Sequence, residues 1–378
     1  MKQLPLIFVL ALSFDLTAQV HNLDEQRKIV FPDIPGYLTL KCDLHQHTVF
    51  SDGGVWPTIR VSEALRDNLD AIAVTEHIEH QPHQHDIPHP DRNRAFEIEL
   101  EAAKGESLIV ISGSEITRKM PLGHANAIFV HDVNKLMMDD SVAVFREAKQ
   151  QGAFTFLNHP HWTGQKKDGV AVLNDVHHQL IKEGLLDGIE VVNDVTYSDE
   201  ALQIALDNNL TILGTSDIHG LVDWEYRVPE GGHRPITLVF ATEKSLAGIK
   251  EGLENRRTVA YFDNLLIGQE AYLKPLIRAC VSVKEAKYQT RDRIILEVTL
   301  RNNSSAEFLL QNKTNLTFQT HANLVMIAPH SEATLEVRTM QKLANVSLKF
   351  SVINAIIAPS THPDLELEVS IPDSIQAE

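Results

Sequence analysis

Short apolar runs alternate with amphipathic stretches between about residues 38 and 262. The apolar runs, which are rich in β-branched residues, are LTLKCDLHQH, DAIAVTEH, SLIVISGSEIT, GAFTFLNHP, DGIEVVN, LTILGTSDIHG and PITLVFAT. The intervening stretches have apolar residues at helical spacing: TIRVSEALRDN, NRAFEIELEAAKG, SVAVFREAKQQG, EALQIALDNN and SLAGIKEGLENR. Several end at Gly or Asn, as helices often do. This alternation predicts a parallel sheet covered by helices, either a barrel or a doubly wound sheet.

The positions of the polar residues decide between these two folds. In nearly every run, His, Asp or Glu stands at the C-terminal end of the expected strand, as in HQH, EH, NHP and DIH. Polar residues that gather at one end of many parallel strands are typical of the active face of a (β/α) barrel. No G-x-G-x-x-G or Walker motif opens a helix, which disfavours a nucleotide-binding fold. We therefore predict an α/β barrel over residues 38–265.

The pattern changes after the barrel. Short alternating strands separated by Asn, Ser and Pro turns follow, in IRACVSVKEAKY, RIILEVTLRNNS, LLQNKTNLTFQT, NLVMIAP, EATLEVRTM and VSLKFSVINAII. This spacing predicts a small immunoglobulin-like β-sandwich over residues 276–372. We expect this domain to pack against the barrel and stabilise it.

The first residues resemble a cleaved secretory signal. They contain one Lys, an apolar run from Leu4 to Phe14 and the small residue Ala18. The run is too short to span a bilayer, so we expect residues 1–18 to be removed and the protein to lack stable membrane insertion. The alternatives are a buried first helix and an uncleaved anchor. The predicted location is the periplasm or the outside of the cell.

Composition narrows the classes of function. The 378 residues include 34 Lys and Arg against 51 Asp and Glu, which gives a net charge of −17 and disfavours nucleic-acid binding. The two cysteines, Cys42 and Cys280, lie in strand-like runs, so we expect buried free thiols rather than a disulfide scaffold. Of the 19 histidines, 15 precede residue 221, which suggests metal ligands. The sequence does not indicate the oligomeric state.

Six histidines and three carboxylates at the expected strand ends are the candidate metal ligands. They are His45, His47, Asp52, His77, Glu115, His124, His159, Asp217 and His219. Residues i and i+2 of a strand point to the same side, so His45/His47 and Asp217/His219 each present two ligands to one cavity. Imidazole and carboxylate together suit zinc, manganese or iron. Nine ligands fit three ions if one carboxylate bridges two of them.

Other histidines carry a weaker signal. His80, His83, His85 and His89 lie in the Pro-broken stretch HIEHQPHQHDIPHP, which we interpret as a solvated loop that could line the entrance of the site. His161, His177 and His178 are interpreted in the same way, as residues outside the metal centre.

The motifs DLHQHTVFSDG, TEH, GSEIT, NHP and TSDIHG together resemble the polymerase and histidinol phosphatase (PHP) family of metal-dependent phosphoesterases. The resemblance covers residues 38–262 and implies a distorted (β/α)7 barrel with a trinuclear site. It assigns His45, His47, Glu115 and Asp217 to one ion, His124, His159 and the bridging Glu115 to a second, and Asp52, His77 and His219 to a third. Two positions depart from the family pattern: Glu76 stands where an Asp is common, and Asp52 where some members have His.

The resemblance implies hydrolysis of a phosphate ester by a metal-activated hydroxide. The signal-like N-terminus, the stretch EITRKMPLGHANAIFV and the sandwich are similar to a secreted branch of phosphodiesterases, so the expected substrate is a small phosphate diester. The alternatives are a phosphomonoesterase, a metallohydrolase acting on C–N or C–O bonds, and a non-catalytic exported metal-binding or glycan-binding protein. No Ser or Cys motif suggests a covalent nucleophile.

The expected catalytic residues are Glu115, Asp217 and one arginine. Arg118, Arg227 and Arg234 follow ligand-bearing segments, and Arg234 in GGHRPIT is the favoured contact to phosphoryl oxygens. The aromatic residues Trp162, Trp224 and Tyr226 are candidates for the wall of a leaving-group pocket.

Overall fold

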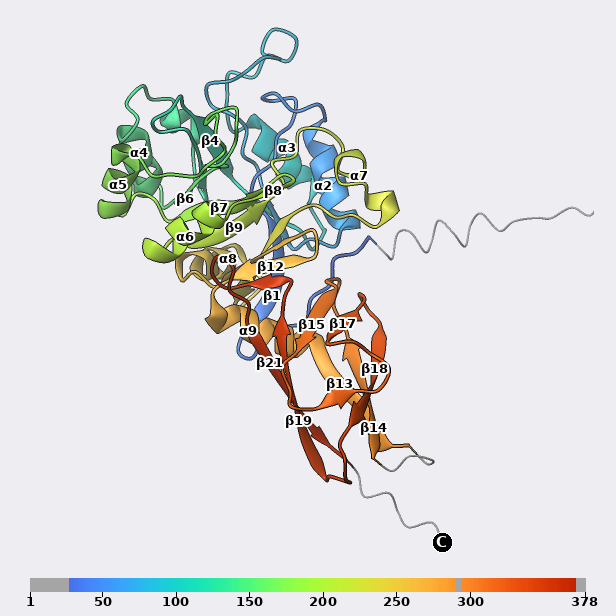
Figure 1. Cartoon of the computed structure of the whole chain (residues 1–378). Coiled ribbons are helices and arrows are strands. Elements are labelled where there is room, and N and C mark those ends of the chain that lie inside the picture. The colour runs from blue at the N-terminus through green and yellow to red at the C-terminus, as the bar shows by residue number, and fades with distance from the viewer. Residues whose placement is uncertain (1–26, 290–293, 372–378) are drawn as a thin grey trace, which may run out of the picture.

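The computed structural model describes residues 27–289 and 294–371. The chain forms a larger N-terminal domain and a C-terminal β-domain (Figure 1). The predicted signal peptide, residues 1–18, lies outside the described residues. Within the described ranges, no helix is both long and apolar enough to span a lipid bilayer.

The first sheet of the N-terminal domain has seven strands in the order β20-β12-β11-β10-β1-β2-β3. Their bounds are β1 Leu38–Asp43, β2 Ala71–Ala73, β3 Ile109–Ile111, β10 Ile236–Ala241, β11 Thr258–Phe262, β12 Leu265–Gly268 and β20 Ala355–Ile356. Strands β1, β2 and β3 are parallel, as predicted. The prediction was wrong for β10, which is antiparallel to β1.

The second sheet runs β4-β5-β6-β7-β8, and β9 pairs with the other edge of β7. The bounds are β4 Gly113–Thr117, β5 His124–Ile128, β6 Phe154–Leu157, β7 Gly188–Asn193, β8 Thr196–Tyr197 and β9 Thr211–Thr215. Strands β6, β7 and β9 are parallel. Strand β5 was not predicted, and it runs antiparallel to both of its neighbours.

Backbone contacts beyond the strand ends join the two sheets. His77 forms a bridge with Glu115, and Gln46 forms one with Ile218. The amide of Asp217 also donates to the carbonyl of His45 at 2.8 Å. The pairings therefore pass in a ring through β1, β2, β4, β5, β6, β7 and β9. The ring closes at the end of the strands that carries the predicted metal ligands.

Helices cover the outside of these sheets (Figure 1). Their bounds are α2 Pro57–Arg66, α3 Arg94–Ala102, η1 Val133–Leu136, α4 Ala143–Gln150, α5 Asp175–Lys182, α6 Asp199–Asp207, α7 Val222–Glu225, η2 Val228–Glu230, α8 Leu246–Glu254 and α9 Glu270–Cys280. The five predicted helices correspond to α2, α3, α4, α6 and α8. Each buries an apolar face, such as Val144, Phe145 and Ala148 of α4. Packing against the sheets therefore accounts for the helical periodicity of the sequence.

The C-terminal domain is a sandwich of two four-stranded sheets, β13-β14-β18-β16 and β17-β15-β19-β21. The strands are β13 Val281–Tyr288, β14 Ile295–Asn302, β15 Phe308–Asn312, β16 Thr317–Phe318, β17 Leu324–Ile327, β18 Glu332–Arg338, β19 Asn345–Val352 and β21 Asp364–Ser370. Alternate residues of β21 are buried, which is the period expected for one face of a sandwich. The domain begins after α9, a few residues later than predicted.

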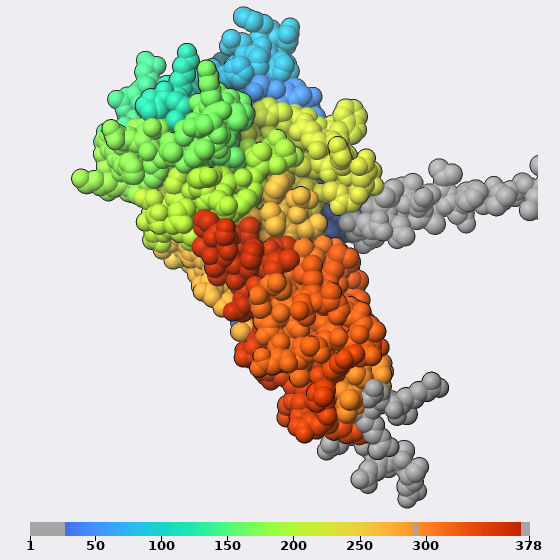
Figure 2. All heavy atoms as spheres, viewed as in Figure 1, coloured from blue at the N-terminus to red at the C-terminus, as the bar shows by residue number. Residues whose placement is uncertain are grey.

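The two domains share an apolar core. One cluster of buried side chains contains Ile72, Phe240 and Leu276 from the N-terminal part and Leu296 and Phe308 from the sandwich. Strand β20 leaves the sandwich and pairs with β12 of the first sheet. Figure 2 shows part of the C-terminal domain, in red, lying on the N-terminal domain. The predicted packing role of the sandwich agrees with this arrangement.

Both cysteines are free and buried, as predicted. Cys42 lies in β1 and Cys280 ends α9.

Candidate metal centre

All nine predicted ligands lie at one end of the strands. His45, His47 and Asp52 follow β1, His77 follows β2, Glu115 lies in β4, His124 begins β5, His159 follows β6, and Asp217 and His219 follow β9. Because β5 is antiparallel, its first residue lies beside the last residues of the other strands. Strand β5 therefore contributes His124 from its N-terminal end, whereas the other strands contribute ligands from their C-terminal ends.

Two histidines and two carboxylates form the most buried group. His45 Nε2 lies 3.0 Å from His47 Nε2. Asp217 Oδ1 lies 3.1 Å and 3.0 Å from these two nitrogens, and Glu115 Oε2 lies 3.5 Å and 3.4 Å from them. Two imidazole nitrogens and two carboxylate oxygens therefore face a common point, which is a donor set suited to zinc, manganese or iron.

The second oxygen of Glu115 faces another pair of histidines. Glu115 Oε1 is 2.8 Å from His124 Nδ1 and 3.5 Å from His159 Nε2. His159 Nε2 also lies 3.9 Å from Asp217 Oδ2. Glu115 thus lies between two groups of nitrogens, where a bridging carboxylate is expected. The φ angles of His159 (27°) and Asp217 (51°) are in the left-handed region, which is costly for residues other than glycine and is often found at functional sites.

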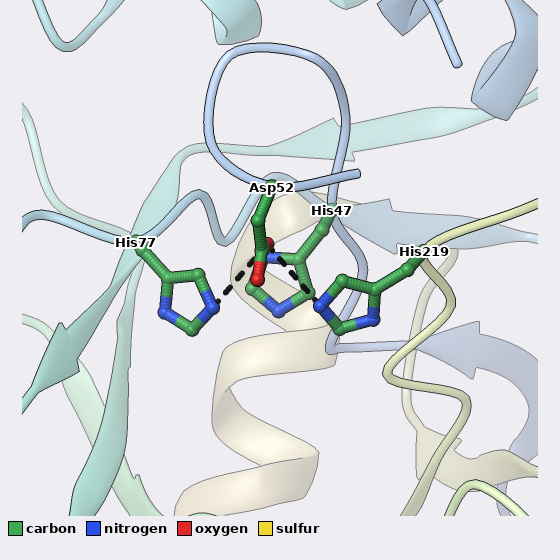
Figure 3. A group of neighbouring side chains, drawn as sticks. All are labelled: His47, Asp52, His77 and His219. Atoms are coloured by element: carbon green, nitrogen blue, oxygen red, sulfur yellow. Dashed lines mark ion pairs between the residues drawn. The ribbon is translucent and has the colours of Figure 1, made fainter. Parts of the chain in front are cut away.

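Asp52 approaches a third group from the loop after β1 (Figure 3). Its Oδ1 lies 3.4 Å from His77 Nε2 and 3.2 Å from His219 Nε2. The ring of His47 stacks between those two rings, with centroid distances of 4.4 Å to each. His77 Nδ1 meanwhile lies 2.7 Å from Glu115 Oε2, so His77 presents one nitrogen to each of two groups.

Four polar atoms of the ligand side chains are buried and form no hydrogen bond within the described part of the chain: Asp52 Oδ1, Glu115 Oε2, His124 Nδ1 and His159 Nδ1. The first three lie against other ligand atoms instead, as in the 2.8 Å contact between His124 Nδ1 and Glu115 Oε1. Buried polar atoms are normally satisfied, and leaving them unpaired is costly. A divalent ion would complete their coordination, so the residues present fit bound metal.

The close packing of imidazoles and carboxylates shifts the pKa values of the histidines. Burial and the adjacent His77 lower the pKa of His47 to about 3, which leaves its imidazole neutral. Although burial opposes it, Glu115 and Asp52 raise the pKa of His77 to about 10. Burial likewise opposes a charged His45, yet Asp217 and Glu190 raise its pKa well above the usual value. Protons thus provide the positive charge that metal ions would replace, so metal binding should release protons.

Glu190 is a residue of the site that the sequence analysis missed. It lies inside β7, and its Oε1 accepts hydrogen bonds from His45 Nδ1 at 2.8 Å and Thr215 Oγ1 at 2.7 Å. Its Oε2 accepts from the amide of His159 at 2.7 Å and from Asn193 Nδ2 at 2.9 Å. Such carboxylates fix the tautomer and orientation of ligating histidines. A Glu within the otherwise apolar run GIEVVN was the signal available.

Arg60 fixes the segments that carry several ligands. This fully buried side chain donates from Nε to the carbonyl of His47 at 2.9 Å, from Nη2 to that of Ile218 at 3.1 Å, and from Nη1 to that of Gly220 at 2.8 Å. One guanidinium on α2 therefore holds the extensions of both β1 and β9.

Glu76, which stands where the family commonly has an Asp, positions the loop that carries Asp52. Its carboxylate accepts hydrogen bonds from Ser51 Oγ and Thr48 Oγ1. A Cβ at Gly53 would lie 2.7 Å from the carbonyl carbon of His47, which explains why glycine follows Asp52.

A cavity of about 540 Å³ opens over the ligands. Trp162 and His80 line it, whereas Trp224 does not and is 77% exposed. His80 Nε2 lies 3.8 Å from Asp52 Oδ2, so this loop histidine lines the entrance. Tyr226 is buried, and its hydroxyl donates to the carbonyl of Ser216 at 2.6 Å, so it supports the fold instead of forming the wall.

The prediction that Arg234 contacts substrate was wrong. Its side chain is fully buried, and its guanidinium pairs with Asp43 at 3.2 Å and Asp67 at 2.9 Å. The cavity does not include it. Arg118 pairs with Glu79 at 2.9 Å, and Arg227 also lies outside the cavity lining.

A solved structure of a related protein agrees with this fold. A solved two-domain protein from Bacteroides vulgatus, which contains a predicted PHP-like metal-dependent phosphoesterase, is 43% identical and superposes with a TM-score of 0.83. The match covers 90% of this chain and 98% of that one. The chain therefore belongs to the family of two-domain proteins with a PHP-like metal-dependent phosphoesterase domain, which confirms the resemblance drawn from its motifs.

Two further comparisons concern parts of the chain or distant relatives. A family model for an Ig-like domain matches residues 281–368, which corresponds to the sandwich. The solved structure of PsfC from Pseudomonas syringae is 17% identical, with a TM-score of 0.40, over 59% of this chain and 91% of that one. None of the curated proteins matches this chain.

Proposed function

We propose that the protein is an exported metal-dependent phosphodiesterase that hydrolyses a small phosphate diester at a site for three divalent ions. The observation that carries the proposal is that six histidines and three carboxylates gather at one end of the strands, where six of these nine side chains line a single cavity. Family membership supports a phosphoesterase, and the donor set suits zinc, manganese or iron.

The three groups of side chains support the assignment of ligands. His45, His47 and Asp217 form one group, His77, Glu115 and His124 a second, and His47, Asp52, His77 and His219 a third. His159 joins the second through its 3.5 Å approach to Glu115. The ring of seven strands likewise supports a distorted (β/α)7 barrel, and the apolar N-terminal run supports export to the periplasm or the outside of the cell.

Preference for a diester follows from the charge of the cavity. Divalent ions, when bound, activate water and neutralise charge on the phosphoryl group. Among the described residues that line the cavity there is no Lys or Arg. A monoester dianion has one more charge than a diester and gains most from additional cationic side chains. The residues present therefore favour the singly charged diester.

The remaining polar groups of the chain keep the site oriented. Asn193 Nδ2 donates to Asp217 Oδ2 at 3.2 Å and to Glu190 at 2.9 Å, which fixes the carboxylate of Asp217. Thr117 Oγ1 lies 2.6 Å from His77 Nδ1. These contacts hold the ligands in place before substrate arrives, so little reorganisation is needed during the reaction.

The test compares bis(4-nitrophenyl) phosphate with 4-nitrophenyl phosphate, using metal-stripped protein reloaded with manganese or zinc. We expect faster, metal-dependent cleavage of the diester. His159→Ala should abolish this activity, and His131→Ala, which changes an exposed histidine outside the cavity, should retain it. Preference for the monoester would instead indicate a phosphomonoesterase. Inactivity on both substrates at full metal occupancy would refute the phosphoesterase proposal.

A further inference from the structure

Two carboxylates in the wall of the cavity take no part in the metal centre. Asp194 and Glu225 line the cavity beside Asp217 and His219. Among the described residues, neither has an Arg, Lys or His nitrogen within ion-pair distance. The carboxylates of the metal centre, by contrast, are surrounded by imidazoles. No cationic side chain of the described residues therefore contacts these two carboxylates, although both line the cavity that the substrate must enter.

The fold holds Asp194 in a fixed position. Its φ angle of 51° places it in the left-handed region, which Asp tolerates better than most residues. Its amide donates to the carbonyl of Thr215 at 3.2 Å, and its Oδ1 lies 3.3 Å from the hydroxyl oxygen of Tyr226, whose proton is directed at the carbonyl of Ser216. The backbone of Asp194 is thus fixed at the cavity wall.

Glu225 is fixed by a different contact. The amide of Gly220 donates to its Oε1 at 2.7 Å. A Cβ at Gly220 would lie 2.1 Å from that oxygen, so glycine allows this approach. The contact occupies one carboxylate oxygen and leaves Oε2 for another partner.

Trp162 adds an aromatic surface to the same cavity. It is 49% exposed, and its ring packs edge-on against His159 with centroids 5.3 Å apart. The faces of indole rings attract ammonium groups, and carboxylates add to that attraction. The hydroxyl of Thr196, a neutral polar group in the cavity wall, already donates its hydrogen bond to the carbonyl of Asn193 at 2.8 Å.

Two carboxylates without a contacting cation and an exposed Trp in the same cavity favour a substrate that carries a positive charge. We propose that one esterified alcohol of the substrate carries an ammonium group, which binds to Asp194 and Glu225 in the cavity that Trp162 also lines. This inference rests on the proposed phosphodiesterase function and specifies its substrate class. The cavity, at about 540 Å³, lies within the range of small-molecule sites and accommodates a phosphodiester of this kind.

The test uses two diesters of the same shape. One is 4-nitrophenyl phosphocholine, and the other is 3,3-dimethylbutyl 4-nitrophenyl phosphate, in which carbon replaces the quaternary nitrogen. We expect the metal-loaded protein to cleave the choline ester with a kcat/KM roughly tenfold higher. The Asp194→Asn/Glu225→Gln variant should lower that ratio towards one, whereas Glu230→Gln, an exposed glutamate outside the cavity, should preserve it.

Equal cleavage of both esters by the unmodified protein, or preference for the uncharged one, would overturn the inference while leaving the phosphodiesterase proposal intact. Calorimetric titration of the metal-loaded protein with phosphocholine and with 3,3-dimethylbutyl phosphate provides a second measurement that needs no turnover. Tighter binding of phosphocholine, lost in the double variant, supports the ammonium site. Equal or weaker binding of phosphocholine refutes the ammonium site. This binding result does not depend on turnover. If bis(4-nitrophenyl) phosphate and both diesters resist cleavage, the phosphodiesterase proposal fails separately.

Discussion

Replacing Glu190 with glutamine should weaken metal binding although Glu190 is not itself a predicted ligand. Each oxygen of this carboxylate accepts two hydrogen bonds, from His45 and Thr215 at Oε1 and from the His159 amide and Asn193 at Oε2. Glutamine has the same shape, but its amide nitrogen would face two donors. The variant therefore loses two of these contacts and the negative charge behind His45.

Loss of a partner behind a ligating histidine typically reduces metal affinity by about 10-fold to 100-fold, or about 1.4 to 2.8 kcal/mol. Because two ligand-bearing segments contact the same carboxylate, we expect the upper part of this range. The assay is zinc competition against a chromophoric chelator, with circular dichroism to verify the fold. Glu101→Gln, at an exposed position on α3, is the matched control and should bind zinc as the unmodified protein does.

A zinc affinity within threefold of that of the unmodified protein, in a folded Glu190→Gln variant, would show that Glu190 does not orient the ligands. A fall in thermal stability of the metal-free variant without a change in affinity would assign Glu190 to the fold alone.

Three further predictions concern stability and loop position. Arg234→Met should destabilise the protein by about 3 to 5 kcal/mol in urea unfolding, because it leaves the buried Asp43 without a cation and removes one of the two arginines that pair with Asp67; a loss below about 1 kcal/mol would contradict this structural role. Gly53→Ala should displace the loop of Asp52 and weaken the binding of one manganese ion in calorimetry, whereas three unchanged binding steps would refute the contact argument. Burial opposes a low pKa for Asp70, but the adjacent Lys41 and Lys244 nevertheless lower this pKa. The stability contributed by Asp70 is thus present above the unfolded-state pKa of about 3.9 and lost as pH falls through the folded-state pKa. The unfolding free-energy difference between the unmodified protein and Asp70→Asn should shrink from pH 6 to pH 3, and a constant difference would exclude this linkage.

The sequence predicted the side chains of the metal centre because strand geometry is local. The i and i+2 positions of His45 and His47 place both on one side of a strand extension, whatever surrounds it. Strand direction is not local information, and the runs of β5 and β10 contain nothing that marks them as antiparallel. Strand β5 was missed because HANAI is short and includes two small alanines and a buried asparagine.

The supporting residues were harder to predict because their partners are distant in the sequence. Arg234 resembled a phosphate contact, but its partners Asp43 and Asp67 lie 191 and 167 residues away. Glu190 lies 145 residues from His45. The sequence shows that a charged residue such as Glu190 is unusual within an apolar strand. Only the folded chain shows which groups pair with Glu190 and Arg234.

The pairing of β20 with β12 has a consequence for how the molecule behaves as a whole. The sandwich completes the edge of a sheet in the catalytic domain and continues its apolar core. Without the sandwich, β12 would be a bare edge available to other chains, a common route to aggregation. The C-terminal domain is therefore better regarded as a built-in protective cap than as a tethered recognition module, and the two domains are expected to unfold in a single cooperative step.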